Sequence, residues 1–146
     1  MQTVQNPTFY RLIYQSRSTL LGKQDLQIEA IQDILLHARR RNIKSGVSGI
    51  LLYNQLDYFQ VLEGSKAAVK LIFRSILRDR RHTNVVTLQR GPAGSRIFHS
   101  WSMAYKELPY GSMWFDYPMH DFPTKLLADG VNTTPGCLAG QGCPLH

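Results

Sequence analysis

Hydrophobic and polar residues alternate along several short stretches of this chain, which is the pattern of a strand with two different faces. In the first stretch Tyr10, Leu12 and Tyr14 share one face, and Arg11 lies on the other. The same pattern, bounded by turn residues, predicts strands over residues 9–16, 47–53, 58–62, 85–90 and 96–104. The polar turn 54–57 joins the second and third of these, so they are expected to form a β-hairpin.

Two longer segments carry apolar residues every three or four positions, which predicts amphipathic helices over residues 25–41 and 66–78. The apolar positions are Ile31, Ile34, Leu35 and Ala38 in the first segment and Val69, Ile72, Phe73 and Ile76 in the second. The first segment also begins with acidic residues and ends with arginines, as the helix dipole favours. The predicted order of elements is therefore β-α-β-β-α-β-β.

This order matches the split β-α-β plan, in which both helices cover one face of a single sheet. We expect an α/β fold of the α+β type, a ferredoxin-like sandwich with one mixed sheet, over residues 9–104. Beyond Leu108 the periodicity stops and five of the seven prolines follow. Residues 105–146 are therefore expected to form an irregular C-terminal extension that packs on the core or is partly disordered.

Length and composition fit one globular domain, because 146 residues with 43% hydrophobic side chains can build one core but hardly two. No window approaches the roughly 20 apolar residues of a membrane span, and the first residues lack a signal-peptide pattern. We therefore expect a cytoplasmic protein with no membrane partner. Cys137 and Cys143 stand in a Gly- and Pro-rich tail without a ligand set around them, so they are expected to be reduced thiols.

The net charge of +7 is concentrated in residues 1–108, which carry +9. Such a basic surface attracts nucleic acid, anionic lipid or a phosphate-bearing cofactor, and charge alone does not separate these partners. No nucleic-acid-binding motif is present, which makes a nucleic-acid partner the weaker hypothesis. The basic clusters 39–41 and 78–82 fall near the ends of the predicted helices, where cations are favourable for the helix itself.

Four residues could carry chemistry, and each also has an ordinary structural interpretation. Gln60 lies between apolar neighbours, so it is either on a solvent-facing side of its strand or buried with partners for its amide. Asn42 fits a helix C-cap, His82 a surface histidine and Trp101 a core aromatic residue. The sequence contains no phosphate-binding loop, no nucleophile elbow and no metal-ligand cluster, so no metal is expected.

Five ordered blocks of this sequence resemble the flavin-binding blue-light sensors known as BLUF domains. The blocks are residues 11–16, Asn42 with 46–53, 59–64, 78–82 and 98–103, and the match covers about residues 9–104. The resemblance implies the same ferredoxin-like sandwich, with an oxidised, non-covalently bound flavin between its two helices. The implied cofactor is FAD, with FMN as the alternative.

The resemblance also implies roles for single residues. Tyr14 matches the redox-active tyrosine of the family, Gln60 its switching glutamine and Asn42 the asparagine that binds the pyrimidine edge of the flavin. Ile34 and Ile76 match the aliphatic residues that sandwich the ring. Polar groups near the polar edge and ribityl chain are matched by Asp79, Arg81 and His82.

Two further positions of the resemblance concern the last strand and the second helix. Trp101 and Met103 match a pair that changes position near the glutamine, and their spacing predicts that both lie on one strand face. An end strand can slide or twist, however, so that only one of the two reaches Gln60. Ser75 departs from the pattern, because some members place an arginine there that reaches the ring. A contact from this position to the flavin C2 carbonyl is therefore not expected.

The function implied is a blue-light photoreceptor without catalysis of its own. Excited flavin would exchange an electron and a proton reversibly with Tyr14, which would rearrange the hydrogen bonds of Gln60 and give a red-shifted signalling state. The output would pass to an unknown downstream protein or to a homo-oligomer formed through the free sheet face and the aromatic tail. The alternatives are a flavin-dependent oxidoreductase and a basic nucleic-acid-binding module on the same fold.

Overall fold

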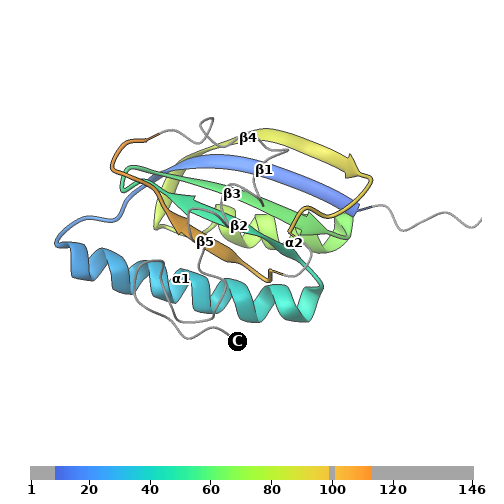
Figure 1. Cartoon of the computed structure of the whole chain (residues 1–146), viewed down its shortest axis with the longest axis horizontal. Helices are drawn as coiled ribbons and strands as arrows, with labels where there is room; N and C mark the ends of the chain where they lie inside the picture. Colours follow the sequence, from blue (N-terminus) through green and yellow to red (C-terminus); the bar gives the residue numbers. More distant parts are fainter. Residues whose placement is uncertain (1–8, 99–100, 113–146) are drawn as a thin grey trace, which may run out of the picture.

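A five-stranded sheet carries both helices on one of its faces (Figure 1). The structure is a computed structural model, and it describes residues 9–98 and 101–112. Its elements are β1 (Phe9–Ser18), α1 (Gln24–Ser45), β2 (Ser48–Tyr53), β3 (Asp57–Gly64), α2 (Lys66–Leu77), β4 (His82–Ala93) and β5 (Ala104–Glu107). The predicted order of elements and the ferredoxin-like sandwich are confirmed.

The strands lie in the order β4-β1-β3-β2-β5. Neighbouring strands run antiparallel except β2 and β5, which run parallel, so the sheet is mixed as predicted. In the ladder between β1 and β3, Tyr14 stands directly opposite Gln60. This register brings residues that are 46 positions apart in the sequence within reach of each other.

Two hydrophobic clusters occupy the two faces of the sheet. The helix-facing cluster takes Tyr10, Leu12 and Tyr14 from β1, which confirms the face predicted from alternation. Ile13 points the other way and packs in the second cluster. The helix-facing cluster is completed by Ile31, Leu35, Ala38, Val69, Ile72 and Ile76 from the helices. Since burial of one such side chain contributes about 1.5 to 3 kcal/mol, these contacts fix both helices on the sheet.

Each helix has a defined boundary. α2 begins after Ser65, whose hydroxyl accepts the backbone N–H of Ala68 over 3.2 Å. α1 ends at Gly46, whose φ of 69° is the left-handed conformation that favours glycine. The C-cap interpretation of Asn42 is therefore wrong, because this residue lies inside the last turns of α1 and is fully buried.

The structure corrects the predicted end of the domain's sheet. The fourth strand, β4, extends to Ala93 rather than ending at residue 90, and the fifth strand is Ala104–Glu107 rather than 96–104. The reason is the buried carboxylate of Glu63, which accepts the backbone N–H groups of Ile97 at 2.9 Å and Phe98 at 2.8 Å. These donors are thereby withdrawn from strand pairing, so this segment crosses the sheet as a loop.

Arg11 completes this anchor, because its guanidinium lies 2.7 Å from the same Glu63 carboxylate. The pair and its backbone contacts hold the segment that leads into β5.

Within the described residues, no helix is both long enough and apolar enough to cross a membrane. Most of the predicted C-terminal extension, with Cys137 and Cys143, lies outside the described residues.

Candidate functional site

A pocket opens between α1 and α2, with the helix-facing side of the sheet as its floor. Tyr14, Leu51, Tyr58 and Gln60 form the floor. The helices contribute Ile34, His37, Ala38, Arg41, Ser75 and Ile76, and the segment after α2 contributes Asp79, Arg81 and His82. The space between these side chains is about 540 Å³ with its open mouth included.

The floor is organised by a hydrogen bond between Tyr14 and Gln60. Tyr14 Oη donates to Gln60 Oε1 over 2.5 Å, and the two residues are 3% and 4% exposed. Gln60 is thus the buried alternative of the two that its sequence position left open. Burial raises the pKa of the Tyr14 phenol well above its usual value, so the side chain keeps its proton at any physiological pH.

Met103 is the second neighbour of the glutamine. Gln60 Nε2 lies 3.4 Å from Met103 Sδ, and both side chains are buried. A thioether is a weak acceptor, so this contact satisfies the amide nitrogen poorly and leaves hydrogen-bonding capacity toward the pocket. The structure therefore brings together Tyr14 of β1, Gln60 of β3 and Met103 of the segment before β5. All three were singled out in the sequence.

Two side chains of α1 bind the backbone carbonyls of residues 102 and 103 and thereby fix the position of Met103. Arg39 Nε donates to Met103 O over 2.8 Å, and Asn42 Nδ2 donates to Ser102 O over 2.6 Å. Arg39 is 1% exposed, so its interpretation as a cation at a helix end is wrong. Asn42 is not among the described residues that line the pocket, although it follows Ala38, which does line it, by one helical turn.

The pocket walls fit the body of a flavin. Ile34 and Ile76 face the cavity from opposite helices, as an apolar ring between them requires. Below them, the Gln60 amide supplies a donor and an acceptor beside a protonated phenol. An isoalloxazine ring is a flat apolar body with a hydrogen-bonding edge, so these residue types suit it.

One arginine beside the pocket is paired with two carboxylates. Arg81 bonds Asp79 through Nη2 at 2.6 Å and Asp33 through Nη1 at 2.8 Å. Burial alone would raise the pKa of Asp79, but hydrogen bonds from Arg81 and its charge lower it below the usual value. The hydrogen bonds to Asp79 likewise raise the pKa of Arg81. Asp79 and Arg81 are therefore both charged at neutral pH.

His82 joins β4 to the neighbouring elements and is not a free surface residue. Its Nε2–H donates to the Ile76 carbonyl over 2.6 Å, and its Nδ1 lies 2.7 Å from Ser16 Oγ. With the ring neutral, Nδ1 accepts the hydroxyl proton. The ring also stands edge-on to Tyr14, with centroids 6.0 Å apart.

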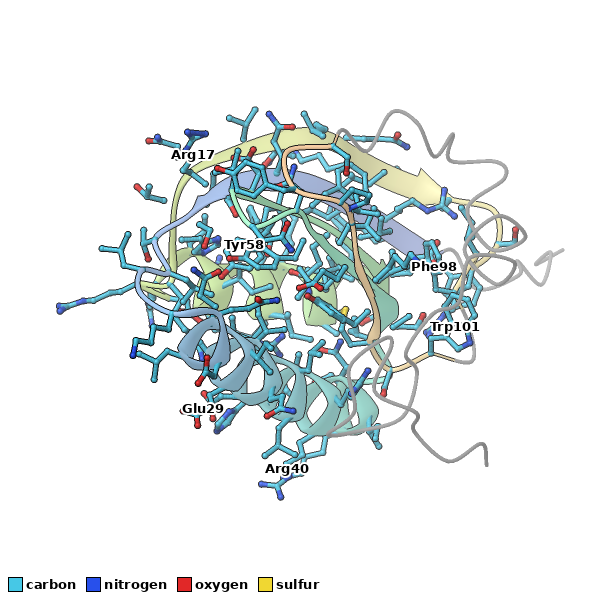
Figure 2. The ribbon with its side chains drawn as sticks, turned by 60° about the vertical axis from the view of Figure 1, so that its left-hand side comes forward. Arg17, Glu29, Arg40, Tyr58, Phe98 and Trp101 are labelled. Carbon is cyan, nitrogen blue, oxygen red and sulfur yellow. The ribbon has the colours of Figure 1, made fainter. Side chains whose placement is uncertain are left out.

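Trp101 lies away from this site, which corrects the expectation that it shares a face with Met103. It packs against the cluster on the far side of the sheet, with its ring centroid 5.8 Å from that of Phe98 (Figure 2). The expectation rested on strand alternation, and residues 101–103 precede β5 instead of belonging to it. In a loop, a spacing of two does not place side chains on one face.

Arg41 is a pocket residue that the sequence reasoning missed. It was included in a cluster interpreted as helix-end cations, yet its Nη1 donates to Ser75 Oγ across the pocket over 3.2 Å. Helical spacing contained the signal, because Arg41 follows Ile34 by seven positions and therefore lies on the same face of α1. An arginine thus does reach the position of Ser75, but from the opposite helix.

Comparison with known proteins agrees with this geometry. Residues 9–104 match the family model described as BLUF, sensors of blue-light using FAD. The blue light- and temperature-regulated antirepressor BluF of Escherichia coli (strain K12) is 39% identical over 97 residues, which are 66% of this chain and 23% of that protein. The photoactivated adenylate cyclase subunit alpha of Euglena gracilis is 37% identical over 93 residues, 64% of this chain and 9% of that protein. This chain therefore spans less than a quarter of either relative.

Solved structures give the same result. The dark-state structure of BlrB, a BLUF protein, superposes with a TM-score of 0.65 at 28% identity and covers 82% of this chain and 85% of its own. The ground state of BlsA has a TM-score of 0.64 at 30% identity, with 86% of this chain and 75% of that chain covered. The chain therefore belongs to the BLUF family of blue-light sensors, which use FAD.

Proposed function

We propose that this chain is a blue-light photoreceptor in which Tyr14 and Gln60 are the photoactive pair. The observation that carries the proposal is the buried hydrogen bond from Tyr14 Oη to Gln60 Oε1 at the floor of the pocket. A bound flavin supplies blue-light absorption and, when excited, a strong one-electron oxidant. Every other part of the switch is built from side chains that the structure brings into contact.

Tyr14 is the electron and proton donor in this proposal. One electron leaves the phenol ring, and the phenolic proton leaves along the hydrogen bond to the Gln60 amide. Both return to Tyr14 afterwards, so no net oxidation takes place and no substrate is consumed. The raised pKa of Tyr14 supports this role, because the proton is present in the dark at any physiological pH.

Gln60 stores the signal as a rearranged amide. In the structure its Oε1 accepts from Tyr14 and its Nε2 faces the weak acceptor Met103 Sδ at 3.4 Å, and this arrangement would be the starting state. Rotation or tautomerisation of the amide would redistribute its donors and acceptors and change its hydrogen bonding to the chromophore. Such a change at the flavin C4 carbonyl would shift the absorption to longer wavelength.

The remaining pocket residues would hold the chromophore. Ile34 and Ile76 would clamp the ring. Asn42 would bond its pyrimidine edge if its amide turned away from Ser102 O, to which it donates in the structure. Near its polar edge and ribityl chain the polar contacts would come from Asp79, Arg81 and His82. Trp101 would act on the far face of the sheet, where it could transmit a change rather than detect it.

The output would pass to a partner protein or to a second copy of the chain, without catalysis by this domain. Edge strand β4 supports such an interface, because it exposes Val86 and Leu88, which are 49% and 47% accessible. Size-exclusion chromatography with light scattering, in the dark and under blue light, tests this output. A light-independent mass together with steady NAD(P)H turnover would favour an oxidoreductase instead.

Light-minus-dark absorption spectroscopy on the purified full chain tests the photoreceptor itself. We expect a flavin spectrum that shifts to longer wavelength under blue light and returns completely in the dark. A flavin spectrum that bleaches without return, or does not respond to light, would contradict the proposal.

A further inference from the structure

The segment just before β5 is held by its backbone carbonyls. The carbonyl of Trp101 accepts the backbone N–H of Gly49 over 3.0 Å. The next two carbonyls accept side-chain N–H groups of α1, from Asn42 at 2.6 Å and from Arg39 at 2.8 Å. Residues 101–103 therefore take their position from hydrogen bonds to β2 and α1, although they precede the strand itself.

Arg39 is the unusual donor in this set, because a guanidinium is costly to bury. The residue is 1% exposed, and charged side chains are almost never buried so fully unless they are paired or hydrogen-bonded. Its bond to the Met103 carbonyl is charge-assisted and shielded from water. Loss of this bond is therefore expected to be more costly than loss of a hydrogen bond at the surface.

Met103 connects this buried cation to the photoactive pair. Its carbonyl accepts from Arg39 Nε, while its Sδ lies 3.4 Å from Gln60 Nε2. Rearrangement of the Gln60 amide changes the group that faces the sulfur, so Met103 has to adjust its position. An adjustment that moves the backbone of this residue stretches or breaks the hydrogen bond to Arg39.

We propose that Arg39 is a positioning residue that holds Met103 in its starting arrangement and thereby shortens the lifetime of the signalling state. The hydrogen bond is made in the starting state and weakened once Met103 moves, so re-forming it favours the return. This inference rests on the proposed function, since it requires the rearrangement of Gln60. It adds a role for a side chain that does not line the pocket.

Two substitutions of similar length separate the hydrogen bond from the size of the side chain. Arg39→Met keeps an unbranched stem but has no donor. Arg39→Gln places an amide nitrogen the same number of bonds from the backbone as Nε of arginine, so it can still donate to the carbonyl. The rate of return is measured on the full chain with its flavin, as decay of the red-shifted absorption after a blue-light pulse.

The two variants should differ in that rate. We expect Arg39→Met to return about three- to tenfold more slowly than the native chain, because one charge-assisted hydrogen bond is worth roughly tenfold or more and is only partly remade in the transition state. Arg39→Gln should return at close to the native rate. Arg40→Met is the matched control, since it removes a cation from the exposed side of α1 (Figure 2) and should not change the rate.

A double variant tests whether Arg39 acts through the sulfur of Met103. In the Met103→Leu background the contact to Gln60 is already removed. Arg39→Met should therefore slow the return by less than about twofold there. A general loosening of the fold would instead slow the return equally in both backgrounds.

An infrared measurement on the native chain covers the case in which Arg39→Met does not fold. Methionine with an isotope label at its carbonyl carbon is incorporated, and light-minus-dark spectra are recorded. We expect a difference band of the labelled carbonyl that is absent from labelled Met103→Leu, because the carbonyl of residue 103 changes its hydrogen bond.

Four results would overturn the role of Arg39. The first is a native rate in Arg39→Met, and the second is equal slowing in Arg39→Met and Arg39→Gln. The third is equal slowing by Arg39→Met with and without Met103→Leu. The fourth is a native chain that shifts reversibly to longer wavelength without the labelled carbonyl band. A native chain without any reversible red shift would refute the photoreceptor itself, and this inference with it.

Discussion

Tyr14 and Gln60 stand opposite each other in the β1–β3 ladder, and the phenol of Tyr14 donates to Gln60 Oε1 over 2.5 Å. The pair depends on strand register, because a slip of one residue between β1 and β3 would turn one of the two side chains to the other face of the sheet. Hydrophobic neighbours on the same face, such as Leu12 and Leu62, hold that register. The photoactive geometry is therefore a consequence of core packing.

The flavin should be bound without a covalent link. Its pocket is formed by side-chain packing between two helices, and the described lining includes no cysteine. We expect acid or denaturant to release all the colour into the supernatant after the protein is removed by filtration. Colour retained on the denatured chain would point to a covalent flavoprotein and a different site.

Tyr14→Phe should keep the flavin and lose the light response. The ring packing against Phe73, with centroids 5.5 Å apart, would remain, whereas the phenolic proton and the easily oxidised ring would be lost. Absorption spectra before and after blue light check this, with flavin content per chain as the control. A normal reversible red shift in Tyr14→Phe would remove Tyr14 from the mechanism.

Met103 and Trp101 should differ in their effects, because they lie on different faces of the sheet. Met103→Leu keeps the volume but removes the sulfur that contacts Gln60, so we expect the red shift to persist while the dark-recovery rate changes several-fold. Trp101→Ala should leave that rate close to wild type and lower the free energy of unfolding by less than the about 3 to 5 kcal/mol typical of a fully buried tryptophan.

Recovery kinetics after a light pulse and denaturant unfolding in the dark measure the two effects. A Trp101→Ala protein without any red shift would show that this residue acts directly at the chromophore. Met103→Leu with unchanged recovery would show that the contact to Gln60 does not control the return.

Gly49 should be a strict structural requirement of the central sheet. A Cβ at this position would lie 1.8 Å from the backbone oxygen of Val61 on the adjacent strand β3. Gly49→Ala is therefore expected to lower the free energy of unfolding by about 1 to 3 kcal/mol or more. Gly94 is the matched control, since a Cβ there meets nothing within 4 Å. Equal stability of the two variants in urea would contradict this account of β2–β3 packing.

Alternation and helical spacing predicted most of the fold because each element buries one regular face. Leu12 and Leu62 on the strands and Leu35 and Ile72 on the helices all pack where their period placed them. The fifth strand was predicted at the wrong position because the residues before it bind Glu63, which is distant in the sequence. Nothing local to residues 97–98 reveals that a carboxylate 34 positions away takes the N–H of Ile97.

Site residues could be predicted from the sequence where the residue type is unusual for its position in a strand or helix. Gln60 in an apolar strand was one such signal, although only the register with Tyr14 shows that it is buried. Arg39 and Arg41 were missed because charged residues near a helix end have an ordinary explanation. Their burial depends on the path of residues 102–103 and on α2, which the sequence of α1 does not contain.

The central claim is that the Gln60 amide is the switch, and Gln60→Leu tests it most directly. Leucine keeps the approximate volume but removes every donor and acceptor between Tyr14 and the pocket. Flavin should still bind, because the loss of one neutral hydrogen-bonding partner costs about 1 to 3 kcal/mol. The dark spectrum should be displaced from that of the native chain, since one hydrogen bond near the ring is missing.

The decisive measurement is the light-minus-dark absorption spectrum of Gln60→Leu, recorded beside the native chain at equal flavin content. The account predicts no red-shifted state in the variant and a reversible red shift in the native chain. A Gln60→Leu protein that forms the red-shifted state under blue light and returns in the dark would show that Gln60 is an ordinary strand residue, and would contradict the mechanism.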